Sequence, residues 1–287
     1  LGGGAVGAPG IPRLVGAPDT CARASGAALI LCPRMYPTFF RIGNFDITTF
    51  GVLVAMGALI GLWVFGRELV RGGLPASASD AAMAGVFGGL LGAKLLWVFE
   101  HLGGEPFRDL LFSRGGMSWF GGLLGGVGTA LIVMRRQRLP MVATLAAATP
   151  ALAIGHAIGR IGCFLVGDDY GRPSDLPWAV AFPQGLPPTE VRVHPTQLYE
   201  AIALAVLAWL LLRWRRRDVR DSVVVGRYLV LAGSIRFGIE FIRVNTPVVG
   251  PLTLAHVVSL ALVIVGVAVL GLSSRETGHG GAKTSGI

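Results

Sequence analysis

Residues 159–172 of the chain read GRIGCFLVGDDYGR. The stretch begins at the end of an apolar run of helical length, and its glycines predict a turn. It places Arg160 near a membrane boundary and two carboxylates, Asp168 and Asp169, shortly after it. A charge at that depth costs roughly 3 kcal/mol or more unless it is paired or faces a polar cavity. We therefore predict that this stretch forms one wall of a site for an anionic lipid head group.

The composition points to a membrane protein. Hydrophobic residues make up 53% of the chain and charged residues 14%, against roughly 25% charged residues in soluble domains. The net charge of +9 is better explained by basic cytoplasmic loops than by nucleic acid, because no basic patch with interleaved aromatic residues occurs. Three cysteines, Cys21, Cys32 and Cys163, show no pairing pattern and no metal-ligand spacing, so we interpret them as structural or incidental thiols.

The chain has three predicted regions. Residues 1–34 are rich in Gly, Ala and Pro, and their one apolar patch is too short to span a bilayer. We expect a disordered leader there, a membrane domain over 35–272, and a cytoplasmic tail over 273–287.

Apolar segments of spanning length predict an all-α, polytopic membrane protein with about seven transmembrane helices. The segments are 45–66, 81–99, 116–134, 139–158, 198–212, 223–242 and 251–272. Between the fourth and the fifth, residues 167–195 contain six prolines, which predicts an irregular segment outside the membrane.

Arginines cluster after the first, third and fifth segments, always on the same side. These arginines are Arg67, Arg71, Arg135, Arg136, Arg138, Arg213, Arg215, Arg216, Arg217 and Arg220. Because cytoplasmic loops carry the excess of Lys and Arg, we expect a cytoplasmic C-terminus, an extracytoplasmic N-terminus and an extracytoplasmic segment 167–195.

A second charged group lies in the sixth segment. Arg236, Glu240 and Arg243 are spaced i, i+4, i+7, which places them on one helix face. Glu240 can neutralise one arginine, so together with Arg160 the site should keep surplus positive charge, which suits a phosphate. The alternative is a structural ion-pair network that ties helices together.

Residues 194–200 read HPTQLYE and open the fifth segment. The proline suits the first turn of a helix and the threonine can cap it. Gln197, Tyr199 and Glu200 then enter the membrane, and we take Gln197 and Tyr199 as candidate substrate-binding residues. His194 is a natural proton acceptor near neutral pH. A capping cluster without substrate contacts is the alternative.

These elements together resemble the bacterial prolipoprotein diacylglyceryl transferases. The resemblance extends from Met35 to about residue 272. It rests on MYP at 35–37, RIG at 41–43, GGMS at 115–118, GRIG at 159–162, HPTQLYE at 194–200 and the later residues Arg236, Glu240 and Arg243.

The resemblance implies an enzyme of the bacterial inner membrane that needs no metal or cofactor. Its substrates would be phosphatidylglycerol and the signal peptides of prolipoproteins, whose lipobox cysteine receives the diacylglyceryl group as glycerol phosphate leaves. It also implies that Arg160 and Arg236 are the key arginines, that Asp168 is the acid following the first, and that Glu240 and Arg243 support the second.

The chain departs from the family pattern at four polar positions. Phe120 stands in place of a histidine, Cys163 in place of an asparagine, and Phe50 and Ala232 in place of tyrosines. This indicates a divergent member of the family. The base that deprotonates the thiol is then either His194 or Asp168, and the sequence does not decide between them. Two alternative hypotheses are kept. The protein could be a transferase that uses the same lipid donor but another acceptor, or a membrane protein that binds phospholipid without catalysis.

Overall fold

The computed structural model describes residues 38–42, 45–103, 106–112, 116–245, 250 and 252–280. The expected leader 1–34, the MYP element at 35–37 and the last residues of the expected tail, 281–287, lie outside this part.

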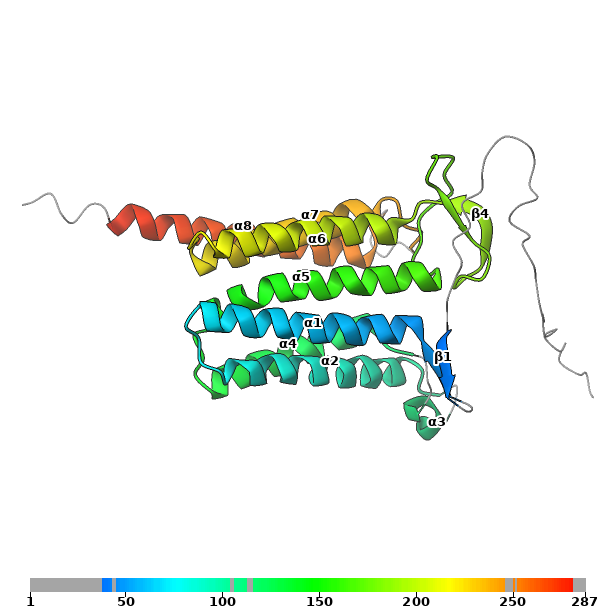
Figure 1. The fold of residues 1–287 in the computed structure, drawn as a ribbon, viewed down its shortest axis with the longest axis horizontal. Coiled ribbons are helices and arrows are strands. Elements are labelled where there is room, and N and C mark those ends of the chain that lie inside the picture. The colour runs from blue at the N-terminus through cyan, green and yellow to red at the C-terminus, as the bar shows by residue number, and fades with distance from the viewer. Residues whose placement is uncertain are drawn as a thin grey trace, which may run out of the picture.

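Long helices lie side by side and form the body of the molecule (Figure 1). They are α1 (Thr49–Arg71), α2 (Ala78–Glu100), α4 (Trp119–Arg136), α5 (Met141–Val166), α6 (Thr196–Arg215), α7 (Asp221–Glu240) and α8 (Leu254–Gly280), with a short α3 (Phe107–Phe112) at one end. The predicted all-α, polytopic membrane fold is confirmed, because six of these helices (α1, α2, α5, α6, α7 and α8) are long and apolar enough to cross a bilayer. Helix α4 has 18 residues with five glycines and two arginines and falls outside that set, so a count of seven spans stays a prediction.

Two small hairpins lie at one end of the bundle (Figure 1). Strands β1 (Thr38–Ile42) and β2 (Phe45–Thr48) pair antiparallel before α1, and β3 (Val180–Phe182) and β4 (Thr189–Val193) pair in the same way between α5 and α6. Residues 167–195 contain no helix, as their prolines predict, but the hairpin within them is not evident from the sequence.

Some helix boundaries differ from the prediction. The first helix begins at Thr49 rather than at residue 45, because the Thr48 side chain caps it by accepting a hydrogen bond from the Gly51 amide (3.1 Å). Helix α5 continues past the glycines of the GRIG motif and ends only at Gly167, whose φ of 73° terminates it. Arg160 is therefore inside a helix, six residues before its end. Helix α8 continues beyond residue 272 into the expected tail.

Glycines allow α2 and α4 to pack with their backbones in contact. A Cβ atom on Gly92 would lie 2.4 Å from the carbonyl oxygen of Gly121, and one on Gly125 would lie 2.3 Å from that of Gly88. Helices α1 and α5 approach in the same way at Gly57, where a Cβ would lie 2.9 Å from a backbone oxygen of α5. Such small-residue contacts are typical of helix pairs in membranes.

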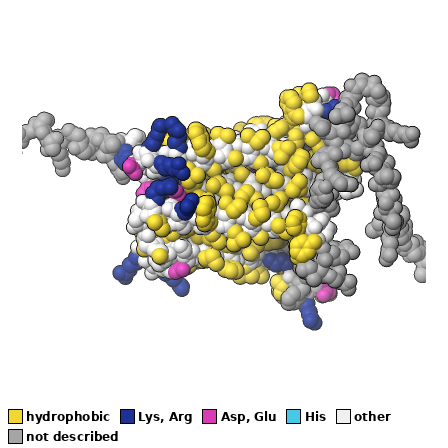
Figure 2. All heavy atoms as spheres, viewed as in Figure 1, with side chains coloured by type: hydrophobic (Ala, Val, Ile, Leu, Met, Phe, Trp, Pro, Cys, Tyr) yellow, Lys and Arg dark blue, Asp and Glu magenta, His cyan; other side chains and the backbone are white. Residues whose placement is uncertain are grey.

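The surface agrees with a membrane environment. Figure 2 shows a broad hydrophobic band around the helices, with charged side chains gathered toward the two ends. The turns between α1 and α2, between α4 and α5, and between α6 and α7 lie at one end of the bundle (Figure 1). These turns hold most of the arginine clusters, so we call this end the arginine-rich end. The hairpins lie at the opposite end.

Candidate functional site

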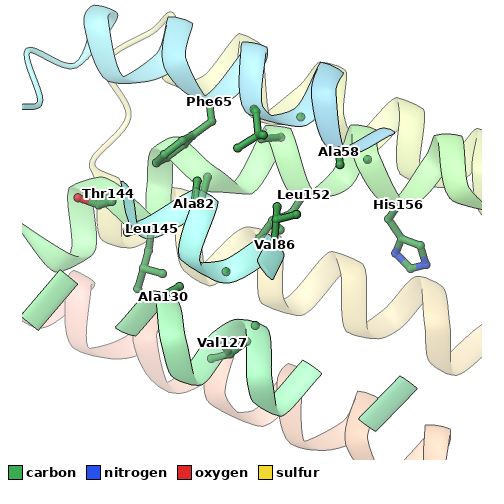
Figure 3. Close-up of a pocket in the computed structure, with 18 of the residues that line it drawn as sticks. Ala58, Phe65, Ala82, Val86, Val127, Ala130, Thr144, Leu145, Leu152 and His156 are labelled. Atoms are coloured by element: carbon green, nitrogen blue, oxygen red, sulfur yellow. The ribbon is translucent and has the colours of Figure 1, made fainter. Parts of the chain in front are cut away.

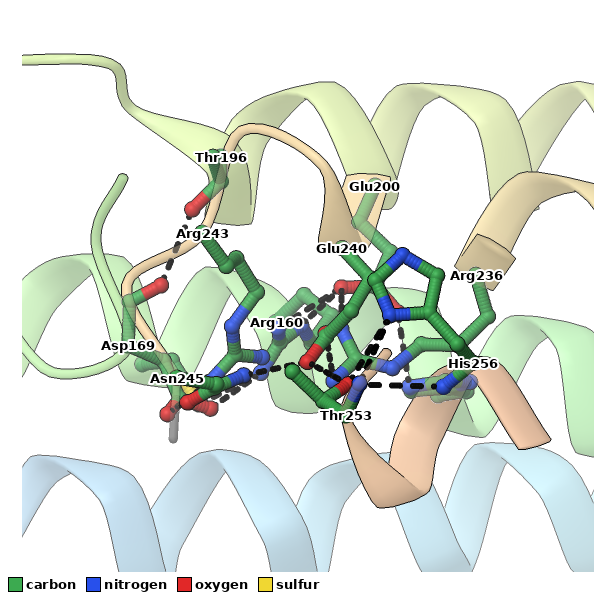
Figure 4. Close-up of polar contacts among 12 residues, drawn as sticks. Arg160, Asp169, Thr196, Glu200, Arg236, Glu240, Arg243, Asn245, Thr253 and His256 are labelled. Atoms are coloured by element: carbon green, nitrogen blue, oxygen red, sulfur yellow. Dashed lines mark hydrogen bonds and ion pairs between the residues drawn. The ribbon is translucent and has the colours of Figure 1, made fainter. Parts of the chain in front are cut away.

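Polar side chains from several elements converge near the end of the bundle opposite the arginine-rich end (Figure 4). Helix α5 contributes Arg160, α6 contributes Glu200, and the last turn of α7 contributes Arg236 and Glu240. The turn after α5 contributes Asp169. We call these residues, together with Arg243, the arginine site.

Arg160 is held by two carboxylates. Its Nε donates to Glu200 Oε2 (2.7 Å) and its Nη1 donates to Asp169 Oδ2 (2.8 Å). The Arg160 side chain is 8% exposed and that of Glu200 1% exposed. Because removing one partner of a buried pair leaves a charge without compensation, this contact links α5 firmly to α6.

Asp169 reaches the site because the chain turns sharply after α5. Gly167 and Asp169 both have positive φ, 73° and 64°, and aspartate is one of the residues that tolerates this conformation. The Asp169 carboxylate also pairs with Arg243 Nη2, and its carbonyl accepts a hydrogen bond from Thr196 Oγ1 (2.9 Å). Burial alone would raise the pKa of Asp169, but Arg243 and Arg160 hold that pKa below its ordinary value.

Asp168 is the acid that the resemblance places after the first arginine, and its surroundings differ from those of Asp169. Its carboxylate forms no ion pair with any residue that the structure describes, and burial followed by the neighbouring charge of Asp169 raises its pKa. Its carbonyl oxygen accepts a hydrogen bond from Gln197 Nε2 (2.6 Å). The arginine partner in this turn is therefore Asp169, one residue later than the resemblance implies.

Arg236 is positioned by a chain of contacts between α7 and α8. Its Nη2 lies 2.7 Å from Glu240 Oε2. The other oxygen, Oε1, accepts hydrogen bonds from Thr253 Oγ1 (2.7 Å) and Asn245 Nδ2 (2.6 Å). His256, which is 3% exposed, has Nδ1 3.1 Å from the same Thr253 hydroxyl. Glu240 therefore has both oxygens engaged and fixes the direction of the Arg236 guanidinium.

The charges of the arginine site are balanced, which differs from the expected surplus. Three guanidinium groups face three carboxylates, since Glu200 and Asp169 join Glu240. Three buried guanidinium nitrogens nevertheless have no hydrogen-bond acceptor among the described residues, although one of them, Nη2 of Arg160, forms an ion pair with Glu200 Oε2 (2.6 Å). The other two are Nη1 of Arg236, which is 3.7 Å from Glu200 Oε2, and Nε of Arg243. The site can therefore offer N–H groups to an added anion.

The predicted site residues of the HPTQLYE stretch divide into two groups. Gln197 is fully buried beside the arginine site, and its Oε1 has no partner among the described residues. His194 and Tyr199 form a separate aromatic contact, with His194 Nδ1 3.4 Å from the Tyr199 hydroxyl, which accepts a hydrogen bond from Trp178 Nε1 (2.7 Å). The structure describes no ion pair between His194 and an acidic residue.

An apolar cavity of about 520 Å³ lies between α1, α2, α4 and α5 (Figure 3). Small and apolar side chains line it, apart from Thr144 and, at one end, His156. His156 Nε2 is 3.5 Å from Glu200 Oε1, so this histidine joins the cavity to the arginine site.

Several residues of the site were not chosen as site residues from the sequence. Glu200 belongs to the HPTQLYE stretch, and His156 precedes Arg160 by one helical turn, so spacing along α5 could have indicated it. Thr253 and His256 carry no such signal. Of the divergent positions, Cys163 lies against the site, with its sulfur 3.5 Å from Arg160 Nη1.

Comparison with known proteins agrees with this architecture. The family model described as prolipoprotein diacylglyceryl transferase matches residues 37–272. The chain belongs to this family. It is 31% identical to the phosphatidylglycerol–prolipoprotein diacylglyceryl transferase of Geobacter sulfurreducens, over 85% of this chain and 97% of that protein. It is 32% identical to the proteins of the same name from Methylobacillus flagellatus (86% and 100%) and Sinorhizobium medicae (85% and 94%).

In this member of the diacylglyceryl transferase family, the arginine site contains residues from several elements. Arg160, Arg236, Glu240 and Arg243, which the resemblance had singled out, come together from α5, α7 and the segment after α7. Family membership and buried guanidinium groups near one end of a membrane bundle thus point to the same chemistry.

Proposed function

We propose that this protein transfers the diacylglyceryl group of phosphatidylglycerol to the lipobox cysteine of prolipoproteins. The relatives' names state both substrates, and the match covers most of the chain. In this reaction a carbon–sulfur bond forms at the glyceride carbon, the carbon–oxygen bond to phosphate breaks, and glycerol phosphate leaves with the electron pair. The thiol proton must go to a base, because the thiolate is the nucleophile.

The observation that supports lipid binding most directly is the pair of buried donors without acceptors, Arg236 Nη1 and Arg243 Nε. Phosphate oxygens are good acceptors for guanidinium groups. In our proposal these donors and Arg160 hold the phosphate and stabilise the charge that grows on it as glycerol phosphate departs. Glu240 keeps Arg236 in place for this, and Asp169 does the same for Arg160 and Arg243.

Gln197 and Tyr199 are proposed as further substrate contacts. The Gln197 side-chain oxygen is buried without a partner and can accept a hydrogen bond from a glycerol hydroxyl. Tyr199, with His194 and Trp178, lies at the start of α6 beside the hairpin β3–β4. There it can contact a signal peptide that approaches from the hairpin end.

The apolar cavity is the proposed place for an acyl chain of the donor lipid. Its lining is almost wholly aliphatic, and His156 at one end touches Glu200 of the arginine site. A phosphate at the arginines would therefore have an apolar space beside it for the attached glyceride.

The proposed setting is the bacterial inner membrane, with the arginine-rich end in the cytoplasm. This places the C-terminus in the cytoplasm, and puts the N-terminus, the hairpins and the arginine site on the extracytoplasmic side. The family match over 37–272 supports treating residues 35–272 as the transferase domain.

The test combines complementation with a purified reaction. A strain depleted of its own transferase should grow when it carries the wild-type gene, and purified protein should release glycerol phosphate from phosphatidylglycerol only when a lipobox peptide is present. Arg160→Ala and Arg236→Ala should each lower the rate by about 10²–10³, whereas Arg217→Ala, at the exposed arginine-rich end, should not. Lipid binding without peptide-dependent release would instead support a non-catalytic protein, and release with a small thiol alone would support another acceptor.

A further inference from the structure

His156 occupies a place that no other described histidine shares. It lies one turn before Arg160 on α5, and its Nε2 is 3.5 Å from Glu200 Oε1. Its side chain is 47% exposed, and it lines the apolar cavity (Figure 3). One side of the imidazole therefore faces a buried carboxylate while the ring remains accessible from the cavity.

The other histidines whose side chains are described are engaged elsewhere. His101 is exposed and stacks on Trp97, whose carbonyl oxygen is 2.9 Å from its Nδ1. His194 contacts Tyr199, and His256 is buried against Thr253 between α7 and α8. None of these three lines the cavity.

We propose that His156 is the base that takes the thiol proton, an inference that rests on the transfer reaction proposed above. Glu200 Oε1, 3.5 Å from Nε2, favours the neutral ring with its proton on Nε2, which leaves the Nδ1 lone pair for the incoming cysteine. The proton moves from sulfur to Nδ1, and the sulfur attacks the glyceride carbon while the bond from that carbon to the phosphate oxygen breaks. The imidazolium is stabilised by Glu200 and then passes its proton to the departing phosphate or to water. A histidine oriented by a carboxylate is a recurrent way to activate such a nucleophile.

The helices packed around His156 differ in the charged groups that they place near it. Glu200 faces it from α6 and Arg160 from α5, while Arg236 of α7 contacts the same glutamate. The residues of α1, α2 and α4 that line the cavity carry no titratable side chain. One carboxylate and two guanidinium groups thus surround the ring on the side of the arginine site, and the cavity side is uncharged.

The experiment compares cysteine and selenocysteine lipobox peptides with purified protein and phosphatidylglycerol vesicles. A selenol is more acidic than a thiol and needs no base near neutral pH. With the cysteine peptide, His156→Gln should lower the rate by about 10²–10⁴, the usual effect of a general base. With the selenocysteine peptide, most of this loss should disappear. His101→Gln, a change at an exposed histidine, should behave as wild type with both peptides.

Two results would overturn the assignment. One is an unchanged rate for His156→Gln with the cysteine peptide, and the other is an equal loss with both peptides, which would indicate a structural role. If His156→Gln fails to fold, His156→Asn, whose side chain likewise cannot take a proton, replaces it in the same comparison of the two peptides. No turnover by wild-type protein with either peptide would reject the proposed function itself, which is a different outcome.

Discussion

Asp168 and Asp169 are adjacent in the chain but have opposite electrostatic surroundings. Asp169 pairs with Arg160 and Arg243, whereas the carboxylate of Asp168 forms no ion pair within the described part of the chain. The pKa of Asp169 is accordingly held below its ordinary value despite burial, and burial together with Asp169 raises the pKa of Asp168. Neutral replacement of each should therefore have opposite consequences.

We expect Asp169→Asn to lower the free energy of unfolding by about 1–3 kcal/mol, because two buried guanidinium groups, Arg160 and Arg243, each lose a charged acceptor. It should also lower transfer activity. Asp168→Asn should leave stability unchanged or raise it, since a charge disfavoured by burial is removed. Thermal unfolding of the purified variants in detergent would measure both, and a larger loss for Asp168→Asn would contradict the assignment of the two aspartates.

The lowered pKa of Asp169 also predicts how the free energy of unfolding depends on pH. A carboxylate whose pKa is lowered on folding stabilises the folded state above the ordinary carboxyl pKa of about 3.9. That contribution is lost as the pH falls through the lowered value. The stability of the wild type should thus decline more steeply below about pH 4 than that of Asp169→Asn.

At the scale of helices, the sequence predicts those side-chain contacts that depend on the spacing of residues within one helix. Arg236 and Glu240 are four residues apart, so their contact within α7 follows from helical periodicity. The Arg160–Glu200 pair could not be predicted in this way, because it depends on how α5 packs against α6. Asp169 enters the site only through two left-handed residues, Gly167 and Asp169 itself, in the turn after α5, and His256 only through the packing of α8 on α7. Almost all long helices were located, while their ends depended on caps such as Thr48.

The packing of α2 against α4 gives a prediction at this scale. Gly92→Leu should strongly reduce the yield of folded protein, because its Cβ alone would already overlap the backbone of α4. Gly128→Leu is the matched control on α4, since a Cβ there meets no atom within 4 Å. Size-exclusion profiles and thermal unfolding midpoints would compare the two, and equal behaviour would argue against the close helix contact.

For the whole molecule, helix α6 carries a buried charge near each end. Glu200 pairs with Arg160 at one end, and Arg215 pairs with Glu68 of α1 at the other (2.5 Å). The second pair lies at the arginine-rich end, where Arg215 also contacts Asp221 (3.0 Å). The hydrophobic band in Figure 2 lies between these ends, so we expect the two ion-pair groups to lie near the two membrane boundaries.

The proposed orientation can be tested with single cysteines in a chain whose Cys21 and Cys32 are replaced; the remaining Cys163 is buried. Asp175→Cys, in the segment between α5 and α6, should react with a membrane-impermeant thiol reagent in intact spheroplasts. Asp218→Cys, in the turn after α6, should react only after permeabilisation. The reverse pattern would place the arginine-rich end outside the cytoplasm.

The 520 Å³ cavity separates the helix pair α1–α5 from the pair α2–α4, where a soluble protein would have interlocking side chains. If a lipid tail lies there during the reaction, it acts for that time as part of the interior, because its atoms supply dispersion contacts that the lining would otherwise lack. Each round of product release would then loosen the interior, and the next donor molecule would tighten it. Thorough delipidation should accordingly lower the heat resistance of this protein, and added phosphatidylglycerol should restore it.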